Sequence, residues 1–182
     1  MSSLEPPVAE LVARARRGDG GAFGELVRRH LRAAFAVALA VLGRPHDADD
    51  IAQEAFVVAF ERLDDCREPA RFSGWLLQIV RNRARHALEK RALRDAASDV
   101  ALLPAPAIAG DVVLRTHLLA ALATLQPVQR EIVLLHDLDG WTHAEIAEAL
   151  GLTEVNCRQH LFTARRALRA ELAHEEVRHG TG

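Results

Sequence analysis

The sequence contains no tyrosine, only one lysine and only two cysteines among its 182 residues. The cysteines, Cys66 and Cys157, have no metal-ligating neighbours at suitable spacing, so the sequence indicates neither a disulfide framework nor a zinc site. Alternating β-branched stretches are also missing, which removes the usual signal for strands. Helical periodicity dominates instead, and the sequence predicts an all-α fold.

Motifs for catalysis and membrane crossing are also missing. There is no glycine-rich phosphate loop, no H-E-x-x-H and no G-x-S-x-G. The longest apolar stretch, LRAAFAVALAVLG, has about a dozen residues, which suits a buried helix but is too short to span a bilayer. No basic-then-apolar signal pattern opens the sequence. We therefore expect a cytoplasmic protein that is not an enzyme, does not insert into membranes and uses no cofactor or metal.

Arginine supplies almost all of the positive charge. Lys90 is the single lysine in a total of 23 basic residues, against 25 acidic residues, for a formal net charge of −2. The chain is 49% hydrophobic and 26% charged, which is typical of a globular protein. Because the net charge is small, the distribution of charge along the chain is more informative about binding partners than its sum.

Residues 95–111, DAASDVALLPAPAIAGD, interrupt the helical periodicity with prolines and small residues. This composition favours a flexible linker, although a long ordered loop within one domain is the alternative. Periodic helices lie on both sides of it. The sequence therefore predicts two small helical domains, at residues 8–94 and 112–174.

The first predicted domain contains one acidic and one basic helix. From Pro45 to Glu61 there are five acidic residues and no Lys or Arg, whereas from Leu76 to Arg94 there are six basic residues and one acid. The two helices could simply pair with each other. However, Arg81 and Arg85 lie on the opposite helical face from Arg83. At least one of the two basic sets is therefore expected to face solvent or a polyanion.

Phe72 and Trp75 lie where a loop containing Pro69 leads into the basic helix. Aromatic side chains beside a basic helix can stack on unpaired bases. Core packing is the alternative, and it is the favoured role for Trp75 alone, because two leucines follow it.

The segment DGWTHAEIAEALGLTEV predicts a helix, a turn and a second helix. Thr142 and Glu145 match the T-x-x-E capping box at the start of the first helix. Gly151 can supply the positive φ that ends it, and Thr153 can cap the next helix. A short capped helix, a glycine turn and a basic helix describe a DNA-binding helix-turn-helix, although a helical hairpin in an unrelated bundle has the same outline.

The basic helix has a narrow apolar stripe made by Cys157, Leu161, Ala164 and Leu168. Its outer face and one flank carry arginine, amide and hydroxyl side chains, which can read base edges and hold phosphates. A solvated helix on a domain surface is the alternative. The candidate DNA-contacting residues here are Arg158, Gln159, Phe162, Thr163, Arg165 and Arg166.

Taken together, these motifs resemble the bacterial RNA polymerase sigma factors of the extracytoplasmic-function (ECF) group. DADDIAQEAFVVAFERL is similar to the helix that binds core polymerase, and FSGWLLQIVRNRARHAL to the helix that melts and captures the minus-ten promoter element. The segment LATLQPVQREIVLLHDLDGWTHAEIAEALGLTEVNCRQHLFTARRALR is similar to the module that reads the minus-thirty-five element. Residues 155–160 depart from the G-T-V-K-S-R that often begins the recognition helix, which leaves the promoter sequence open.

The resemblance implies that the protein binds core RNA polymerase, at its clamp helices and flap, and directs promoter recognition, DNA melting and transcription initiation. It implies contacts with duplex promoter DNA and with the single-stranded non-template strand, and an anti-sigma factor as a further partner. The implied core-polymerase-binding residues are Asp47, Asp49, Asp50, Gln53 and Glu54. The implied minus-ten residues are Phe72, Trp75, Arg81, Asn82, Arg83 and Arg85. The resemblance assigns the six candidate residues of the basic helix to the minus-thirty-five element.

A stand-alone helix-turn-helix repressor or activator is the alternative function. Such a protein binds its operator without polymerase, usually as a dimer on a palindrome. Under that alternative, the first domain serves as an effector or dimerisation domain.

Overall fold

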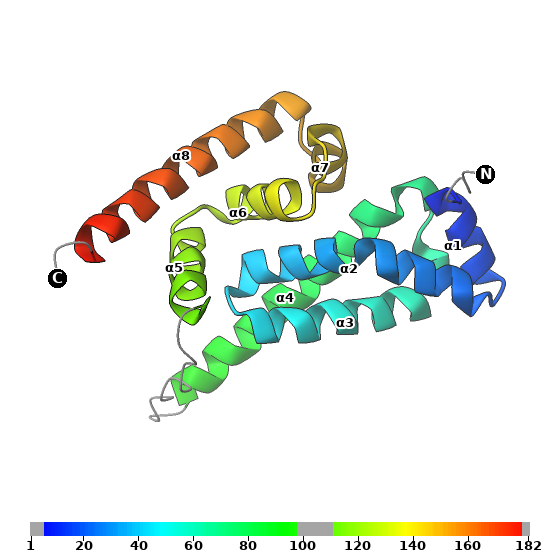
Figure 1. Cartoon of the computed structure of the whole chain (residues 1–182). Helices are drawn as coiled ribbons and strands as arrows, with labels where there is room; N and C mark the ends of the chain where they lie inside the picture. Colours follow the sequence, from blue (N-terminus) through cyan, green and yellow to red (C-terminus); the bar gives the residue numbers. More distant parts are fainter. Residues whose placement is uncertain (1–5, 98–110, 180–182) are drawn as a thin grey trace.

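A computed structural model describes residues 6–97 and 111–179, and the part described is helical without strands, as the sequence predicts (Figure 1). The first half of the chain forms α1 (Val8–Arg16), α2 (Gly20–Leu42), α3 (Pro45–Glu61) and α4 (Phe72–Ala97). Two short 3₁₀ turns, Leu63–Asp65 and Pro69–Arg71, join α3 to α4. The second half forms α5 (Asp111–Ala123), α6 (Pro127–Val133), a π-helical turn (Leu134–Leu138), α7 (His143–Leu150) and α8 (Glu154–His179).

Helix α2 lies at the centre of the molecule. Asp19 caps its first turn by accepting a hydrogen bond of 3.0 Å from the Ala22 N–H, and Gly43, at a φ of 66°, ends it. Between these ends, α2 is buried almost all round from Ala33 to Ala40. A helix that is apolar on every side is covered on every side. The apolar stretch of the sequence is therefore the buried helix that its length predicts.

Three helices of the first half pack around α2. Helix α1 packs near its N-terminal end, while α3 and α4 run along its length. The core face of α3 is mostly alanine, which allows its backbone to come close to α2. Helix α4 contributes a stripe at helical spacing that is fully buried: Phe72, Leu76, Leu77, Val80 and Ala84.

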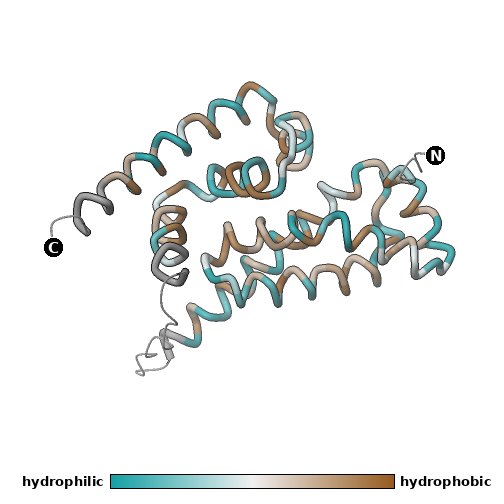
Figure 2. Tube along the Cα trace, in the orientation of Figure 1, coloured by the Kyte–Doolittle hydropathy of each residue, from teal (hydrophilic) through white to brown (hydrophobic). Residues whose placement is uncertain are grey.

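The second half lies across the first (Figure 1). Helix α6 and the π-helical turn pack on α2, α7 packs on α4, and α8 lies beyond α6 and α7 on the side away from α2. Arg130 of α6 donates to the carbonyl oxygens of Leu122 in the last turn of α5, of Leu125 just after that helix, and of Ala40 in α2. Both α2 and α6 are hydrophobic where they lie side by side (Figure 2), and the buried residues of the two halves form one continuous cluster.

The predicted linker, residues 95–111, overlaps the end of α4 and the first residue of α5. Helix α4 continues to Ala97 and α5 begins at Asp111, and residues 98–110 lie outside the described part of the chain. The domain limits at 94 and 112, and the flexibility of the segment between them, remain predictions from the sequence.

Candidate nucleic-acid interface

The helix-turn-helix forms as its local sequence predicts. The Thr142 hydroxyl accepts a hydrogen bond from the Glu145 N–H, and the Glu145 carboxylate accepts one of 2.8 Å from the Thr142 N–H, which completes the capping box. Gly151 ends α7 with a φ of 68°. The Thr153 hydroxyl then accepts from the Asn156 N–H at the start of α8. These caps satisfy backbone donors at both helix starts and fix the angle between α7 and α8.

Helix α8 buries one face and leaves the other exposed. Cys157, Leu161 and Ala164 are almost fully buried, and Leu168 is partly buried, so the predicted apolar stripe is correct. Phe162 keeps 69% of its surface exposed, an unusual state for a large aromatic ring. The structure exposes five of the six candidate duplex-contacting residues and leaves the sixth, Arg165, half-buried. A continuous polar and aromatic face is therefore open for a ligand.

Ion pairs orient two of the arginines on α8. Arg158 pairs with Glu154 at 2.8 Å within the first turns of the helix. Arg165 reaches back to the π-helical turn, where its Nε donates a hydrogen bond of 3.1 Å to Asp137. Partial burial raises the pKa of the Asp137 carboxyl, but hydrogen bonds from Arg165 and His136 outweigh it, so the pKa lies below its usual value. Arg165 is thus held in a fixed position at the edge of the exposed face.

Two histidines that the sequence interpretation did not single out lie behind α8. The rings of His136 and His143 are 4.8 Å apart, and His143 Nδ1 lies 3.7 Å from the Cys157 sulfur. Burial, followed by the charge of His136, lowers the pKa of His143. Among the described residues no group of three or more His, Cys, Asp or Glu side chains is placed to hold a metal ion. This histidine pair is therefore part of the packing between α7, α8 and the π-helical turn.

The aromatic residues at the start of α4 have different environments. Phe72 is completely buried, with its ring against His30 at 5.3 Å and Trp75 at 5.8 Å. The prediction that Phe72 contacts minus-ten DNA is wrong for this arrangement, because a base cannot stack on a ring that has no exposed surface. Trp75 is only partly buried and lines a cavity. Of the two aromatics, Trp75 alone is accessible to a base.

The polar and basic side chains of α4 also differ in their exposure and partners. Asn82 and Arg85 are exposed, and Arg83 pairs across the helices with Glu54 of α3. Arg81, by contrast, is buried: its Nε donates a hydrogen bond of 2.8 Å to Glu131 of α6, and each side chain is only 8% exposed. The predicted contact of Arg81 with DNA is therefore not available here, because the second half of the chain covers it.

The acidic face of α3 is accessible. Asp49, Asp50, Gln53 and Glu54 are exposed and Asp47 is half-buried, so the candidate polymerase-binding residues share one surface. Two exposed apolar side chains, Val57 and Phe60, continue this surface toward the end of the helix. Some acidic groups also pair within the chain, Glu54 with Arg83 and Asp47 with Arg91. The helix thus presents a mixed acidic and apolar face.

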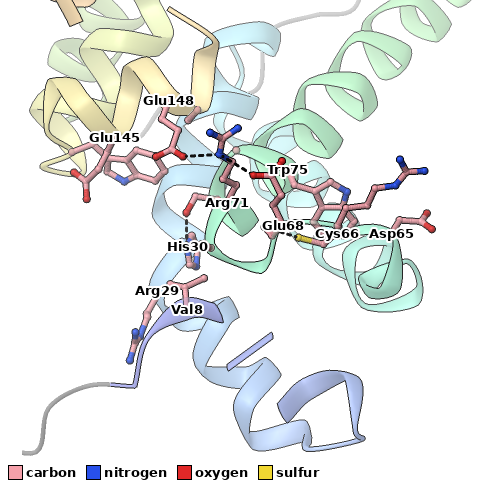
Figure 3. A pocket seen from close by; sticks show the side chains of 16 residues that line it. Val8, Arg29, His30, Asp65, Cys66, Glu68, Arg71, Trp75, Glu145 and Glu148 are labelled. Carbon is pink, nitrogen blue, oxygen red and sulfur yellow. Dashed lines mark hydrogen bonds and ion pairs between the residues drawn. The ribbon is translucent and has the colours of Figure 1, made fainter. Parts of the chain in front are cut away.

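A cavity of about 630 Å³ lies between the two halves (Figure 3). One side is formed by the loop from Asp65 to Arg71 and by Trp75 at the start of α4, and the other by Trp141, Glu145 and Glu148. The Arg71 guanidinium bridges the two sides, with Nε 3.1 Å from Glu148 and 3.3 Å from Glu68. The loop near Asp65–Arg71 therefore borders this cavity.

Sequence reasoning did not single out the residues of the second half that line the cavity or cover α4. Glu131, Glu148 and Trp141 come from three separate segments and carry no common motif. One signal was present: Glu131 directly precedes the apolar run IVLL, and a glutamate that is buried with such a run requires a partner. Sequence spacing does not reveal which residue is that partner, because the contact forms only when distant segments pack together.

Comparison with known proteins gives the same assignment for both halves. A family model described as "Sigma-70 region 2" matches residues 26–94, and one described as "Sigma-70, region 4" matches residues 115–168. RNA polymerase sigma factor NccH of Alcaligenes xylosoxydans xylosoxydans is 35% identical, over 95% of this chain and 99% of NccH. ECF RNA polymerase sigma factor SigM of Mycobacterium tuberculosis is 31% identical, over 88% of this chain and 82% of SigM.

Other similar proteins differ in length or are known as complexes. Probable RNA polymerase sigma factor RfaY of Xanthomonas campestris pv. campestris is 35% identical over 87% of this chain, but the match spans only 42% of RfaY. The solved structure of CnrH in complex with the cytosolic domain of CnrY superimposes with a TM-score of 0.69 at 28% identity, covering 92% of this chain and 98% of CnrH.

The chain therefore belongs to the ECF group of RNA polymerase sigma factors. It is a DNA-binding initiation factor that binds core RNA polymerase and directs it to promoters. Within the described residues, no helix is both long and apolar enough to cross a membrane.

Proposed function

We propose that this chain divides the work of initiation among three surfaces. The exposed acidic face of α3 docks on the clamp helices of core polymerase, and the second half contacts the flap. The start of α4, with the loop before it, holds the single-stranded non-template strand at the minus-ten element. The outer face of α8 reads duplex DNA at the minus-thirty-five element.

The observation that carries this proposal is the exposed outer face of α8. Helix α8 follows the capped helix α7 and buries one apolar stripe against the rest of the chain. Its solvent side therefore presents Gln159, Phe162 and Thr163. Side chains of this kind suit the major groove, where an amide pairs with adenine and an apolar group contacts the thymine methyl. Exposing a phenylalanine to water has no structural benefit, which favours a role in binding.

The minus-ten surface rests on the cavity and its neighbours. Trp75 offers an aromatic face, and Asn82, Arg83 and Arg85 supply donors on the accessible sides of α4. Unstacking a base costs a few kcal/mol, and stacking on an aromatic side chain returns about 1–3 kcal/mol per base, so a pocket plus phosphate contacts can hold an unpaired strand. The chain itself performs no covalent chemistry and is not an enzyme; polymerase supplies the catalysis, in the cytoplasm.

An anti-sigma factor is a proposed further partner of the chain. The similar protein CnrH was solved in complex with the cytosolic domain of CnrY, and the sigma factor RpoE of Bartonella quintana, which shares the fold, was solved with the anti-sigma factor NepR. Both likenesses support a regulatory protein partner without identifying it.

The test is core-dependent transcription on a genomic promoter library. Purified chain with core polymerase should yield transcripts from a defined set of promoters, and neither component alone should do so. The variant Asp49→Lys with Asp50→Lys should lose co-purification with core polymerase while keeping its helical circular-dichroism spectrum, because both carboxylates are exposed. The matched control is Asp64→Lys, which reverses an exposed carboxylate in the 3₁₀ turn after α3 and should still assemble. Unchanged assembly of the double variant would overturn the assignment of α3.

A further inference from the structure

Arg16, in the last turn of α1, reaches a loop that is far away in the sequence. Its Nε and Nη2 donate hydrogen bonds of 3.3 Å and 3.1 Å to the carbonyl oxygen of Leu63, and Nη2 also donates to that of Cys66. Both acceptors belong to the connection between α3 and α4, 47 and 50 positions from Arg16. One planar guanidinium thus joins α1 to two points of this loop.

The two carbonyl groups lie in a buried part of the loop. The side chains of Leu63 and Cys66 are almost fully buried, so water has little access to the backbone between them. A buried carbonyl that lacks a donor costs free energy. Arg16 supplies N–H groups from a side chain that is itself only 27% exposed. The guanidinium therefore fixes the backbone at both points.

The Cys66 thiol extends this restraint along the loop. It donates a hydrogen bond of 3.6 Å to the carbonyl oxygen of Glu68, just before the second 3₁₀ turn, Pro69–Arg71. Burial raises the pKa of the thiol, so it keeps its proton and remains a donor. The backbone from Leu63 to Glu68 is thus held by Arg16 at one end and by the thiol at the other.

The side chains of the same loop line the cavity (Figure 3). Asp65, Glu68 and Arg71 are exposed there, and Trp75 lies beside them at the start of α4. Carboxylates accept hydrogen bonds from the amino groups of bases, a guanidinium donates to base oxygens and ring nitrogens, and an indole can stack on a base. The loop therefore presents the groups that distinguish one unpaired base from another.

Discrimination between bases by hydrogen bonds requires a fixed backbone. Hydrogen bonds weaken steeply when donor and acceptor move out of line, so a loop that moves freely offers its side chains to every base alike. Binding groups on a loop are held less precisely than groups on a helix unless further residues support them. Trp75 is supported by α4, whereas the loop is supported by Arg16 and the Cys66 thiol.

We infer that Arg16 is a positioning residue for recognition of the minus-ten element. It does not touch DNA. From α1 it fixes the loop backbone, so that Asp65, Glu68 and Arg71 meet an unpaired base of the non-template strand in one arrangement. The inference rests on the proposed role of this loop, and it gives base preference an origin outside the DNA-binding surface.

The test measures base preference separately from affinity. The probes are single-stranded non-template oligonucleotides that span the minus-ten element of a promoter found in the transcription assay, with each of the four bases at each position. Their binding to holoenzyme is measured by fluorescence anisotropy. With Arg16→Ala, the ratio of affinities for the best and worst base should fall about fivefold at one position or more, which corresponds to one hydrogen bond to the base. The affinity for the worst base should not change, because phosphate contacts made by α4 carry no base information.

Two control variants separate positioning from charge and from general stability. Arg17→Ala removes the same charge at an exposed residue directly after α1 and should leave every ratio unchanged. Val12→Ala removes apolar volume from a fully buried position of α1, so it should lower the thermal stability without altering the ratios. An equal loss of preference in either control would overturn the inference, because charge or stability would then explain it.

A second variant and a second measurement report on the loop itself. Arg16→Gln has a shorter, uncharged side chain that cannot span both carbonyl groups, so it should lower the same ratio and serves if Arg16→Ala does not fold. The Cys66 N–H donates to the Leu63 carbonyl at 3.2 Å, and its hydrogen exchange should be faster in both variants than in the wild-type chain. An unchanged exchange rate in a folded variant would show that Arg16 does not hold the loop, and would overturn the inference even if the preference falls.

The inference and the proposed function can fail separately. If wild-type holoenzyme shows no base preference on the single strand, the proposed role of the loop is wrong. If the wild type shows a preference that survives unchanged in the folded Arg16 variants, the proposed function stands and the positioning role of Arg16 is rejected.

Discussion

Arg81 of α4 and Glu131 of α6 form an ion pair of 2.8 Å in which each side chain is only 8% exposed, although the two residues are 50 positions apart in the chain. It joins a helix of the first half to a helix of the second at the point where both contribute to the shared core. A charge in such a place is stable only while its partner is present.

Removing one residue of the pair should therefore destabilise the fold, whereas replacing both with apolar residues should be tolerated. Arg81→Ala and Glu131→Ala should each lower the free energy of unfolding by about 3 kcal/mol, because each leaves one charge buried alone. Arg81→Met combined with Glu131→Leu should recover most of that loss, since the apolar pair fills the same space. Urea denaturation of these variants and the wild type measures this. If the losses of the two alanine variants simply add in the double alanine variant, the two residues do not interact.

Glycine substitutions should have opposite effects in two helices. Gly151 has a φ of 68° at the end of α7, so Gly151→Ala should cost about 1 kcal/mol through left-handed strain. Gly24 lies inside α2 with open space around its Cβ position, so Gly24→Ala should stabilise by about 0.5–1 kcal/mol. Thermal unfolding of the two variants checks the signs. Stabilisation by both would contradict the cap at Gly151.

The stability of the chain should fall in mild acid because of His30. This side chain is buried, donates from Nδ1 to the Leu26 carbonyl at 2.8 Å and accepts at Nε2 from Ser73 at 3.1 Å. Burial, assisted by the nearby charge of Arg29, lowers the pKa of His30 below its ordinary value despite the hydrogen bond to Leu26. The unfolded chain then binds the proton more readily than the folded chain. The contribution of His30 is fully present above its unfolded pKa and is lost as the pH falls from there through its folded pKa.

The measurement compares the wild-type chain with His30→Gln in urea between about pH 8 and pH 5, which brackets the ordinary histidine pKa. The wild type should lose stability with a slope approaching about 1.4 kcal/mol per pH unit from this residue alone, and the variant should lack that part of the slope. An identical slope in both proteins would mean that His30 does not titrate differently on folding. Because a glutamine side chain cannot reproduce both hydrogen bonds of the imidazole, the variant is expected to be less stable at the alkaline end as well.

Alanine substitutions at two residues on the outer side of α8 should affect DNA binding in different ways. In the proposed docking of α8, Gln159 projects into the groove, so Gln159→Ala should cost about 1–3 kcal/mol at one promoter position and relax the base preference there. Arg166 lies about two turns later, where a helix entering by its N-terminal end has reached the backbone, so Arg166→Ala should weaken all variants alike and remove about one phosphate contact from the salt dependence.

Holoenzyme binding to single-base variants of the minus-thirty-five element, at several salt concentrations, distinguishes the two outcomes. If Gln159→Ala weakens every variant equally, or if Arg166→Ala changes which base is preferred, α8 docks in a different orientation. Glu171→Ala, farther along α8, serves as the control and should alter neither.

The sequence alone determined the helix-turn-helix. Thr142, Glu145 and Gly151 interact with residues only a few positions away, so their caps are local and can be derived from spacing. The buried stripe of α8 follows for the same reason, because one helix places Cys157 and Leu161 on the same side whatever covers them.

Tertiary structure alone decided the surface of α4. Arg81 lies four residues after Leu77 and three before Ala84, both fully buried, so helical spacing places it at the edge of the buried stripe. Spacing cannot reveal that the covering residue is Glu131, because that contact is between distant segments. The burial of Phe72 against His30 has the same origin: periodicity shows that a side chain points toward other elements, but only the packing of those elements decides whether a base could still reach it.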